Sequence, residues 1–259
     1  MKIAYASDLH FEFAPLDLGE IESGDVIILA GDILNVNHFI TQLRIGRIDQ
    51  THIIDFFNTI TSKFKHVFMV MGNHEYYNSQ IDETIQRLVN ALPKYDNFTI
   101  LDGDSVVVDN TLFVGGTLWT DYNNGDIDTL VNAPRMIADY RAIYNGLYTI
   151  TASDIYERHK HFVLWVERID KMGYDNVILI THHSPSMQTT ADEYIGDDVM
   201  NGLFGSNLDY LLKHFDYAVF GHQHNPKTPE VNGCKLLNNS RGYPHEPSFK
   251  TFNLKYINI

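Results

Sequence analysis

Five short runs of apolar residues along the chain end abruptly in polar residues. Each run is rich in Val, Ile, Ala or Phe, a pattern that predicts a strand buried on both faces. Polar side chains follow every run at its carboxyl end, which is the edge where layered α/β folds bind ligands. The runs span 3–6, 26–30, 67–71, 177–180 and 218–220.

Helices are predicted between these strands because apolar residues there recur three and four positions apart. The predicted helices span 37–64, 80–91, 154–171 and 206–215, and Ser153 or Asp154 is expected to cap the third. Turns at Asp109-Asn110 and Asn232-Gly233 predict antiparallel β-structure over 98–119 and over 229–239, the latter continued by 249–259. We therefore expect an α/β fold in which two sheets pack face to face with helices outside.

One segment interrupts this pattern. Residues 120–152 are polar and rich in turn-forming residues, so they are interpreted as an insertion that forms either a short helical cap or a solvated excursion. No repeat, low-complexity stretch or linker divides the sequence. We therefore expect a single domain over residues 1–259.

The composition limits the kind of chemistry. The chain has 259 residues, of which 44% are hydrophobic and 20% charged, so it can bury the core of a globular domain. Its single cysteine, Cys234, excludes an intrachain disulfide and an all-thiolate zinc site. With 19 basic and 33 acidic residues the net charge is -14, which repels phosphate backbones and anionic membranes. An anionic substrate would therefore need a local positive charge, and bound metal is the obvious source.

Targeting signals are not expected in this sequence. The first ten residues carry no long apolar run, and no stretch approaches the eighteen apolar residues of a membrane span. Together with the single cysteine, these features favour a cytoplasmic protein.

Eight residues with polar side chains stand directly after the predicted strands. Their carboxylate, imidazole and amide groups suit Mn²⁺, Fe, Zn²⁺ or Ni²⁺ better than Ca²⁺ or Cu(I). In the pairs Asp8-x-His10 and His222-x-His224, the two side chains would point the same way on an extended chain. The eight residues are Asp8, His10, Asp32, Asn73, His74, His182, His222 and His224.

Seven ligands from this set of eight residues are too many for one tetrahedral ion, but they suit two ions that share a bridge. Asp32 is the natural bridge because a carboxylate has two oxygens. Two divalent ions would outweigh the charges of Asp8 and Asp32. The site would then attract a phosphate despite the acidic chain.

The ordered set of motifs resembles that of the calcineurin-like metallophosphoesterase superfamily. The set comprises Asp8-x-His10, Gly31-Asp32, Gly72-Asn73-His74-Glu75, His182 and Gly221-His222-x-His224. The resemblance implies a four-layer α/β/β/α sandwich of two mixed sheets flanked by helices, with a dinuclear metal centre. It also implies that one ion binds Asp8, His10, Asp32 and His224, and that the other binds Asp32, Asn73, His182 and His222.

Two further features narrow the resemblance within the superfamily. The protein serine/threonine phosphatase branch has an Asp-Arg-Gly run shortly after Gly-Asp, whereas Gly31-Asp32 is followed here by Ile33-Leu34-Asn35. The tail Asn239-Ser240-Arg241-Gly242-Tyr243-Pro244 is similar to an Asn-Pro-Arg-Gly-Tyr-Pro run of small bacterial members, with Ser240 in place of the proline. Neither feature identifies a substrate.

The expected function is hydrolysis of a small soluble phosphomonoester or phosphodiester, such as a nucleotide, by direct attack of a metal-bridging hydroxide. Two divalent ions would serve as cofactors, Mn²⁺ in the first place and otherwise Fe, Zn²⁺ or Ni²⁺. The predicted catalytic residues are Asp32, Asn73 and His74. His74 would protonate the leaving oxygen, which is typically worth about 10²–10⁴-fold in rate.

Two alternatives remain. A metal-dependent nuclease would grip a duplex with a stripe of Lys and Arg, whereas basic residues such as Lys63 and Lys65 are scattered here. A non-catalytic interaction module on the same fold would have lost ligands, whereas every ligand position is filled. We therefore expect a small phosphoester as the partner, with no membrane and no duplex nucleic acid, and the oligomeric state is left open.

Five residues are candidates for substrate contacts, because arginine can take a phosphate in bidentate fashion and an aromatic ring can stack on a base. In the alternative interpretation they pack in the core or lie in solvent. They are Trp119, Tyr122, Arg135, Arg141 and Arg241. Glu75 is expected to anchor the loop 72–75, His183 to pack beside the site, and the remaining histidines, such as His159, to lie at the surface.

Overall fold

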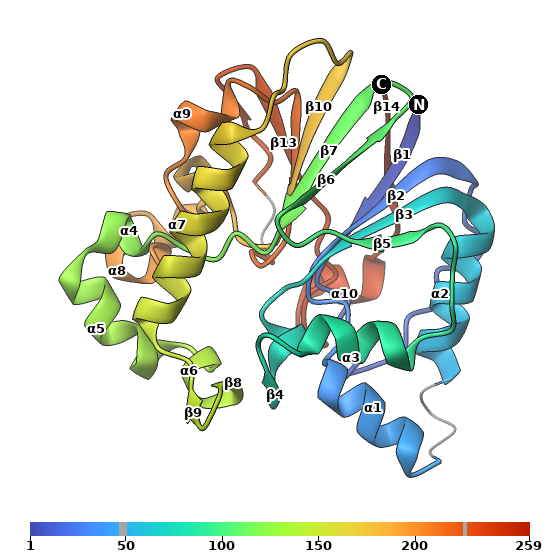
Figure 1. The fold of residues 1–259 in the computed structure, drawn as a ribbon, viewed down its shortest axis with the longest axis horizontal. Coiled ribbons are helices and arrows are strands. Elements are labelled where there is room, and N and C mark those ends of the chain that lie inside the picture. The colour runs from blue at the N-terminus through green and yellow to red at the C-terminus, as the bar shows by residue number, and fades with distance from the viewer. Residues whose placement is uncertain (47–50, 225–226) are drawn as a thin grey trace.

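Two sheets form the centre of the computed structural model, which describes residues 1–46, 51–224 and 227–259 (Figure 1). The first sheet contains β1 (Lys2–Ala6), β2 (Gly24–Ala30), β3 (Phe64–Val70), β5 (Phe98–Ile100) and β14 (Lys255–Asn258). Its strand order is β14-β1-β2-β3-β5, and only β14 at the edge is antiparallel to its neighbour.

The second sheet contains β6 (Asp104–Val108), β7 (Thr111–Gly116), β10 (Asn176–Thr181), β11 (Tyr217–Phe220), β12 (Glu230–Val231) and β13 (Cys234–Asn238). Its order is β12-β13-β11-β10-β7-β6. The four inner strands are parallel, and both edge strands are antiparallel. Both sheets are therefore mixed.

Three apolar clusters separate four layers. Along β1, Ile3 and Tyr5 pack between the sheets with Ile178 of β10, whereas Ala4 and Ala6 face the opposite side. That outer face of the first sheet packs against α1 (Val36–Arg44), α2 (Thr51–Lys63) and α3 (Thr84–Ala91). The outer face of the second sheet packs against α7 (Ala152–Arg168) and α9 (Asp209–Leu212). The predicted α/β/β/α sandwich is confirmed (Figure 1).

The predicted helices are found with shifted ends. The prediction over 37–64 covers the two helices α1 and α2, and its residues 47–50 lie outside the described residues. Helix α7 is capped by Thr151, whose side chain accepts from the Asp154 N–H while the Asp154 carboxylate accepts from the Thr151 N–H. Naming Ser153 or Asp154 as the cap was therefore wrong, because Asp154 occupies the third helical position of a capping box.

Both predicted turns join antiparallel strands, β6 to β7 and β12 to β13. The rest of the two β-segments differs from the prediction. Strand β5 belongs to the first sheet, where it pairs in parallel with β3, and not to the second sheet with β6 and β7. The segment 249–259 begins inside the short helix α10 (Pro247–Thr251), where Pro247 fits the first turn because it needs no N–H partner there. Only β14 is a strand, and its partner β1 lies at the opposite end of the sequence.

The segment 120–152 forms small elements beside the sandwich, namely α4 (Tyr122–Gly125), α5 (Ile127–Met136), α6 (Asp139–Ala142), β8 (Ile143–Asn145) and β9 (Tyr148–Thr149). Strand β8 pairs with β4 (Ser79–Gln80), which follows the short 3-10 helix η2 (His74–Tyr76). The remaining short helices are η3 (Met187–Thr189), η4 (Asp192–Tyr194) and α8 (Asp198–Asn201). No helix in the described ranges combines the length and apolar composition that crossing a membrane requires.

Candidate metal centre

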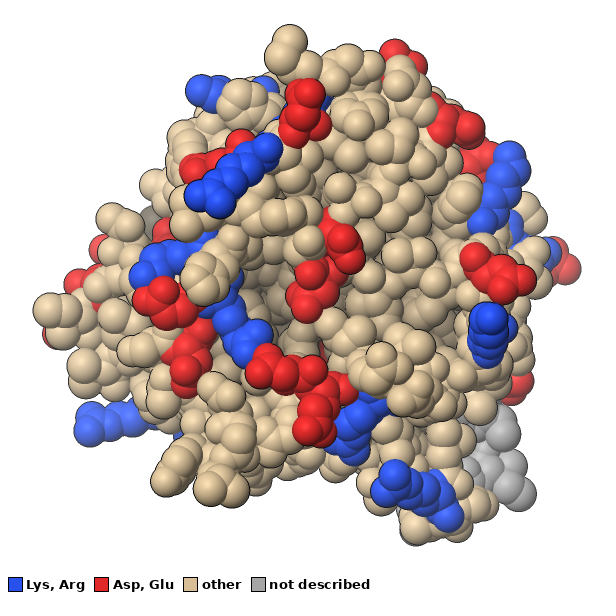
Figure 2. Space-filling model, viewed as in Figure 1, with Lys and Arg blue, Asp and Glu red and all other residues tan. Residues whose placement is uncertain are grey.

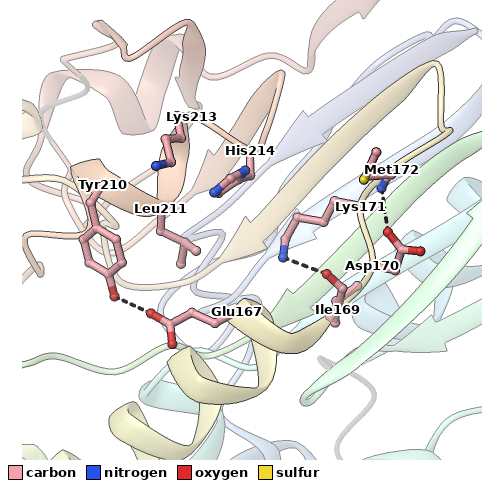
Figure 3. A pocket seen from close by; sticks show the side chains of 9 residues that line it. All are labelled: Glu167, Ile169, Asp170, Lys171, Met172, Tyr210, Leu211, Lys213 and His214. Carbon is pink, nitrogen blue, oxygen red and sulfur yellow. Dashed lines mark hydrogen bonds between the residues drawn. The ribbon is translucent and has the colours of Figure 1, made fainter.

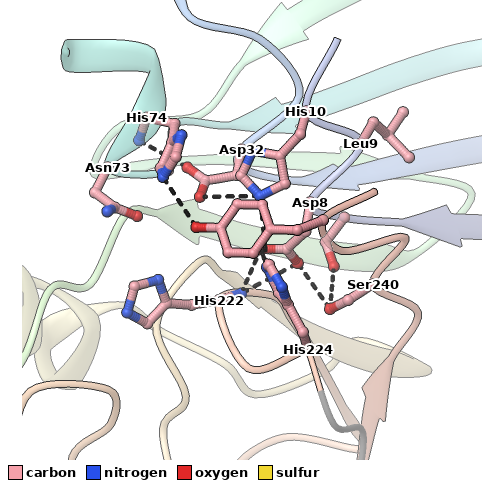
Figure 4. Close-up of polar contacts among 12 residues, drawn as sticks. Asp8, Leu9, His10, Asp32, Asn73, His74, His222, His224 and Ser240 are labelled. Atoms are coloured by element: carbon pink, nitrogen blue, oxygen red, sulfur yellow. Dashed lines mark hydrogen bonds and ion pairs between the residues drawn. The ribbon is translucent and has the colours of Figure 1, made fainter. Parts of the chain in front are cut away.

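The loops after β1, β2, β3, β10 and β11 bring all eight predicted side chains into one cluster, in which Figure 4 labels every residue except His182. Asp32 lies at its middle, because its Oδ2 is 3.4 Å from His182 Nε2 and 3.9 Å from His10 Nε2. Three overlapping groups have ligand atoms within 4.8 Å of one another, and Asp32 belongs to two of them. The groups are Asp8–His10–His224, His10–Asp32–His74 and Asp32–His182–His222.

Four of these residues have left-handed backbone. The φ angles are 51° at Asp8, 48° at His10, 54° at Asp32 and 64° at His222. Asp8 and His10 do direct their side chains toward one place, as expected, but the extended backbone invoked for this was wrong, because both residues have positive φ. Such conformations cost about 1–3 kcal/mol each and persist where the surrounding fold enforces them.

Two glycines allow the loops to approach one another. A Cβ on Gly72 would lie 2.2 Å from Asp32 Oδ1, and a Cβ on Gly31 would lie 2.5 Å from His182 Nδ1. Gly31 also has a φ of +81°, which side chains rarely adopt. Any residue larger than glycine would push these ligands apart.

Hydrogen bonds to Nδ1 orient three imidazole rings. His182 Nδ1 lies 2.9 Å from the Ala30 carbonyl oxygen, His10 Nδ1 lies 3.1 Å from Glu12 Oε1, and His224 Nδ1 lies 3.0 Å from Glu246 Oε1. A hydrogen-bond acceptor beside Nδ1 keeps the proton of the neutral imidazole on Nδ1. The lone pair of Nε2 is then free and points into the cluster. The Nε2 atoms of His10 and His224 accordingly face each other at 3.4 Å.

The donor set fits divalent metal ions. His222 Nε2 is buried and has no hydrogen-bond partner among the described residues, although the His222 backbone N–H donates to Asp8 Oδ1 at 2.9 Å. A buried imidazole nitrogen without a partner is costly unless it has a ligand. Together with the convergent Nε2 atoms and the Asp8 and Asp32 carboxylates, it suits the borderline-to-hard ions expected from the sequence.

Opposite charges control the protonation of the cluster when no ion is bound. Burial opposes ionisation of Asp32, but His182 and His74 outweigh it and hold the pKa of Asp32 well below its usual range. The same pairing raises the pKa of His182 to about 9, against the effect of burial. Asp8 and Glu246 likewise raise the pKa of His224 to about 10.

His74 lies beside the cluster with its ring held by a carboxylate. Its backbone N–H donates to Asp32 Oδ1 at 2.8 Å, and its Nδ1 lies 2.9 Å from Glu12 Oε1. Burial disfavours the charged imidazole, but Asp32 and Glu12 overcome this and raise the pKa of His74 to about 9. The ring therefore carries a proton on Nε2 at neutral pH, where it faces the Tyr243 hydroxyl at 3.3 Å.

Glu75 is the anchor of the two loops that carry Asp32 and Asn73, as predicted. Its carboxylate accepts four backbone N–H bonds, and it is completely buried. Oε2 accepts from Gly72 and Asp32, and Oε1 accepts from Ile33 and Leu34. One side chain thus fixes both loops at the metal centre.

Replacing Glu75 by glutamine is expected to destabilise the fold strongly. The amide nitrogen of the introduced side chain would face two N–H donors, and each orphaned amide costs about 1–3 kcal/mol, so the loss is roughly 2–6 kcal/mol. Urea unfolding of Glu75→Gln measures it, with exposed Glu20→Gln as the matched control. A free energy of unfolding within about 1 kcal/mol of the unaltered protein would contradict the anchoring role.

Asn73 is oriented by a residue that the sequence did not reveal. Asn73 Nδ2 donates to Asp139 Oδ1 at 2.9 Å and to the Tyr77 hydroxyl at 3.0 Å, which leaves its Oδ1 facing His182 Nε2 at 3.0 Å. Asp139 lies on α6 of the segment 120–152, is only 3% exposed, and has its pKa raised by burial. No motif pointed to Asp139. Glu12, by contrast, continues the alternation Asp8-x-His10-x-Glu12 and could have been found.

The five candidate substrate residues lie in different surroundings. Trp119 is buried and packs near Tyr76 and His183, and the buried Tyr122 hydroxyl bonds to that of Tyr140. Arg135 on α5 and Arg141 on α6 are exposed. Arg241 is buried, and its guanidinium donates to backbone carbonyl groups of Leu9, Ala14 and Pro15. Within the described ranges, no hydrogen bond joins any of the five side chains to the eight cluster residues.

Two further histidines complete the surroundings. His183 is buried and packs against His222, with ring centroids 4.2 Å apart. His159 was predicted at the surface, which was wrong. It faces inward from α7, is 4% exposed, and has Nδ1 3.1 Å from the Leu118 carbonyl oxygen.

A surface hollow of about 310 Å³ lies away from these groups, at the carboxyl end of α7 (Figure 3). Its lining includes Lys171, whose ammonium group donates to the carbonyl groups of Val166 and Ile169. Tyr210 there donates to Glu167. Lys171, Tyr210 and Glu167 thus already have hydrogen-bond partners, and the lining of the hollow contains none of the predicted site residues.

The fold and the centre together define a metal-dependent hydrolase of phosphoric esters. A sequence model described as calcineurin-like phosphoesterase matches residues 1–226, and the chain belongs to that family. A curated relative, the uncharacterised protein L509 of Acanthamoeba polyphaga mimivirus, is 26% identical over 274 residues, which are 99% of this chain and 96% of the relative.

A solved structure with the same architecture is that of the phosphopantetheinyl hydrolase PptH from Mycobacterium tuberculosis. Its TM-score is 0.69 at 19% identity, and the match covers 99% of this chain and 95% of that one. At this identity the similarity shows the fold. It agrees with the family that the sequence resemblance indicated.

Proposed function

We propose that the chain hydrolyses a small phosphomonoester or phosphodiester, such as a nucleotide, with two Mn²⁺ ions at this centre. The observation that carries the proposal is the convergence of seven ligand side chains around one centre with Asp32 at its middle, in which the Nε2 atoms of His10, His182 and His224 are directed inward. A structural histidine cluster would not need three separate Nδ1 acceptors that all leave Nε2 free for a ligand.

The residues would divide between the two ions around the shared Asp32. One ion would be held by Asp8, His10, Asp32 and His224, and the other by Asp32, Asn73, His182 and His222. When bound, such ions polarise phosphoryl oxygens and lower the pKa of water to about 7. Asn73 Oδ1 is available as a ligand because Asp139 and Tyr77 hold its amide nitrogen.

His74 would supply the proton for the leaving oxygen. Glu12 fixes the ring through Nδ1, and the raised pKa of His74 keeps Nε2 protonated near neutral pH. A proton donor is most useful when its pKa lies near or above the working pH and it is held in place.

The segment 120–152 would act as a cap over the centre within a single domain. Asp139 of this segment contacts Asn73, and β8 pairs with β4 next to η2, which carries His74. A segment attached at two points beside the site can exclude water and limit substrate size.

A duplex-binding nuclease fits the charge distribution poorly. On the face shown in Figure 2, Lys and Arg are interspersed with Asp and Glu, and no basic stripe crosses the face. The net charge of -14 opposes a phosphate backbone as well. A small substrate can be held by the ions alone.

Hydrolysis of 4-nitrophenyl phosphate and of bis(4-nitrophenyl) phosphate tests the proposal. The protein is stripped of metal with a chelator and reloaded with Mn²⁺, Fe²⁺, Zn²⁺ or Ni²⁺, and bound metal is counted by elemental analysis. Turnover that requires two ions supports the proposal, and the preferred ester separates monoesterase from diesterase. Turnover that persists in the metal-free protein, or failure to bind any ion, would refute it.

Loading the metal-free protein with Mn²⁺ is expected to release about two protons per chain near pH 7, because metal-bound imidazole must be neutral. Without metal, His182 and His224 are protonated there, since Asp32 and Asp8 raise the pKa of these rings to about 9 and about 10. Raising the pH through these values removes the protons, so the release from imidazole vanishes above about pH 10. Calorimetry in buffers of different ionisation enthalpy measures the release, and none at pH 7 would contradict the assignment.

A further inference from the structure

The tail loop, defined as residues 239–246, is fastened to the turn that carries Asp8. The Arg241 N–H donates to the Ser7 carbonyl group and the Gly242 N–H to that of Asp8, both at 3.1 Å. The Ser240 hydroxyl donates to Asp8 Oδ2 at 2.7 Å (Figure 4). The run that resembled a bacterial tail motif therefore lies at the metal centre.

Arg241 ties the tail loop to the segment that follows His10. Its guanidinium donates to the carbonyl groups of Leu9 and Ala14, at 2.9 and 3.0 Å, and to that of Pro15 at 2.7 Å. It also stacks on Phe249, 3.8 Å from the ring centroid. Because Arg241 is only 3% exposed, these contacts hold it rigidly. They thereby support Tyr243, which lies two positions later in the tail loop.

Tyr243 is the side chain that this support holds over the cluster. Its ring stacks on His10, with centroids 4.8 Å apart and planes 29° apart, and meets His224 edge-on at 4.6 Å. Its hydroxyl lies 3.3 Å from His74 Nε2, the nitrogen that faces the expected leaving oxygen. In the described parts of the chain, no other side chain hydrogen-bonds to that nitrogen.

Lysine and arginine side chains of the described residues form no hydrogen bonds with the cluster side chains. Arg241 is turned onto backbone carbonyl groups. The donors that the structure holds beside His74 Nε2 are therefore neutral groups. A half-buried phenol that already reaches His74 Nε2 is the group in position.

We propose that Tyr243 is a catalytic residue whose hydroxyl donates a hydrogen bond to a phosphoryl oxygen of the substrate beside His74, and that Arg241 positions it. The proposal rests on the phosphoesterase function proposed above. The hydroxyl keeps its proton throughout, so no bond of the tyrosine forms or breaks. A preformed neutral donor at that place stabilises charge that develops in the transition state.

Tyr243→Phe tests the proposal, because the variant keeps the ring on His10 and removes only the hydroxyl. With Mn²⁺ bound, kcat for bis(4-nitrophenyl) phosphate is expected to fall about 10²-fold, the loss typical of one such donor. Binding of inorganic phosphate, followed by calorimetry, is expected to weaken about tenfold. Metal content should stay unchanged. Tyr256→Phe, which removes a hydroxyl bonded to the Glu22 carbonyl group, is the matched control.

The outcomes separate this inference from the function on which it rests. Equal kcat and equal phosphate binding in Tyr243→Phe and the unaltered protein would overturn the catalytic role. Loss of bound metal in Tyr243→Phe would overturn it too, since the tyrosine would then act on the ligands. If the unaltered protein turns over no ester, weaker phosphate binding in the variant still supports the contact. Absence of both turnover and phosphate binding in the metal-loaded protein would overturn function and inference together.

Discussion

Asp32→Asn is expected to lower turnover by at least about 10³-fold and to reduce bound metal from two ions to one or none. Lewis-acid stabilisation by the ions is worth several kcal/mol, which corresponds to that factor. The two oxygens of Asp32 have different partners. Oδ1 accepts the His74 N–H at 2.8 Å, whereas Oδ2 faces His182 Nε2 and His10 Nε2.

An asparagine cannot satisfy both sides. With its oxygen toward the ions, its NH₂ group meets the His74 N–H, and two donors then face each other. With its NH₂ group toward the ions, it offers no lone pair as a ligand. Either orientation disturbs the centre although the shape of the side chain hardly changes.

Asp25→Asn is the matched control for this prediction. Asp25 lies near the amino end of β2, the strand whose carboxyl end leads to Asp32, and it binds the Lys2 N–H and the Lys65 ammonium group. Its variant should keep turnover within about twofold, since surface changes of this kind shift stability by about 0.5 kcal/mol or less. An Asp32→Asn protein with two ions and more than a tenth of the turnover would contradict the bridging role.

The sequence predicted the fold and the cluster well for a common physical reason. A strand that is buried on both faces appears in the sequence as an uninterrupted apolar run. The polar residues of the site follow its carboxyl end, as in Ala30-Gly31-Asp32 after β2. Parallel order in each sheet then brings these ends to one edge. The order of layers, with two sheets inside and helices outside, could be predicted because the apolar runs are short and the helical segments lie between them.

The parts that the sequence did not predict depend on contacts between distant segments. Asp139 orients Asn73 from 66 positions away, and Tyr243 reaches His74 from 169 positions away. No local periodicity carries such information. The left-handed turns at Asp8 and His10 were missed for a related reason, because positive φ is uncommon for any residue other than glycine, even for Asp and His, and is enforced here by the surrounding fold. Supports that come from a distant segment, such as Asp139, were thus less predictable than Glu75, which lies within the motif that it anchors.

His74→Ala is expected to keep both ions and to lose rate in proportion to how poor the leaving group is. For alkyl phosphoesters the loss should be about 10²–10⁴-fold, the usual contribution of a positioned proton donor. For 4-nitrophenyl esters it should be much smaller, because nitrophenolate leaves without a proton. The expectation follows from the geometry. Glu12 and the Asp32 carboxylate hold the ring beside the cluster, and no carboxylate of the described residues bonds to its Nε2.

The pH dependence of turnover tests whether His74 acts as a proton donor. The donor must be protonated, so turnover of an alkyl ester should fall as the pH rises through the pKa of His74, which is about 9 without metal. Bound ions offset the charge of Asp32, the main group that raises this pKa, and the descending limb should therefore lie below pH 9. The limb should be absent in His74→Ala and retained in the matched control, exposed His161→Ala on α7. Equal rate losses for alkyl and nitrophenyl esters would show instead that His74 stabilises the phosphoryl group and does not act as the acid.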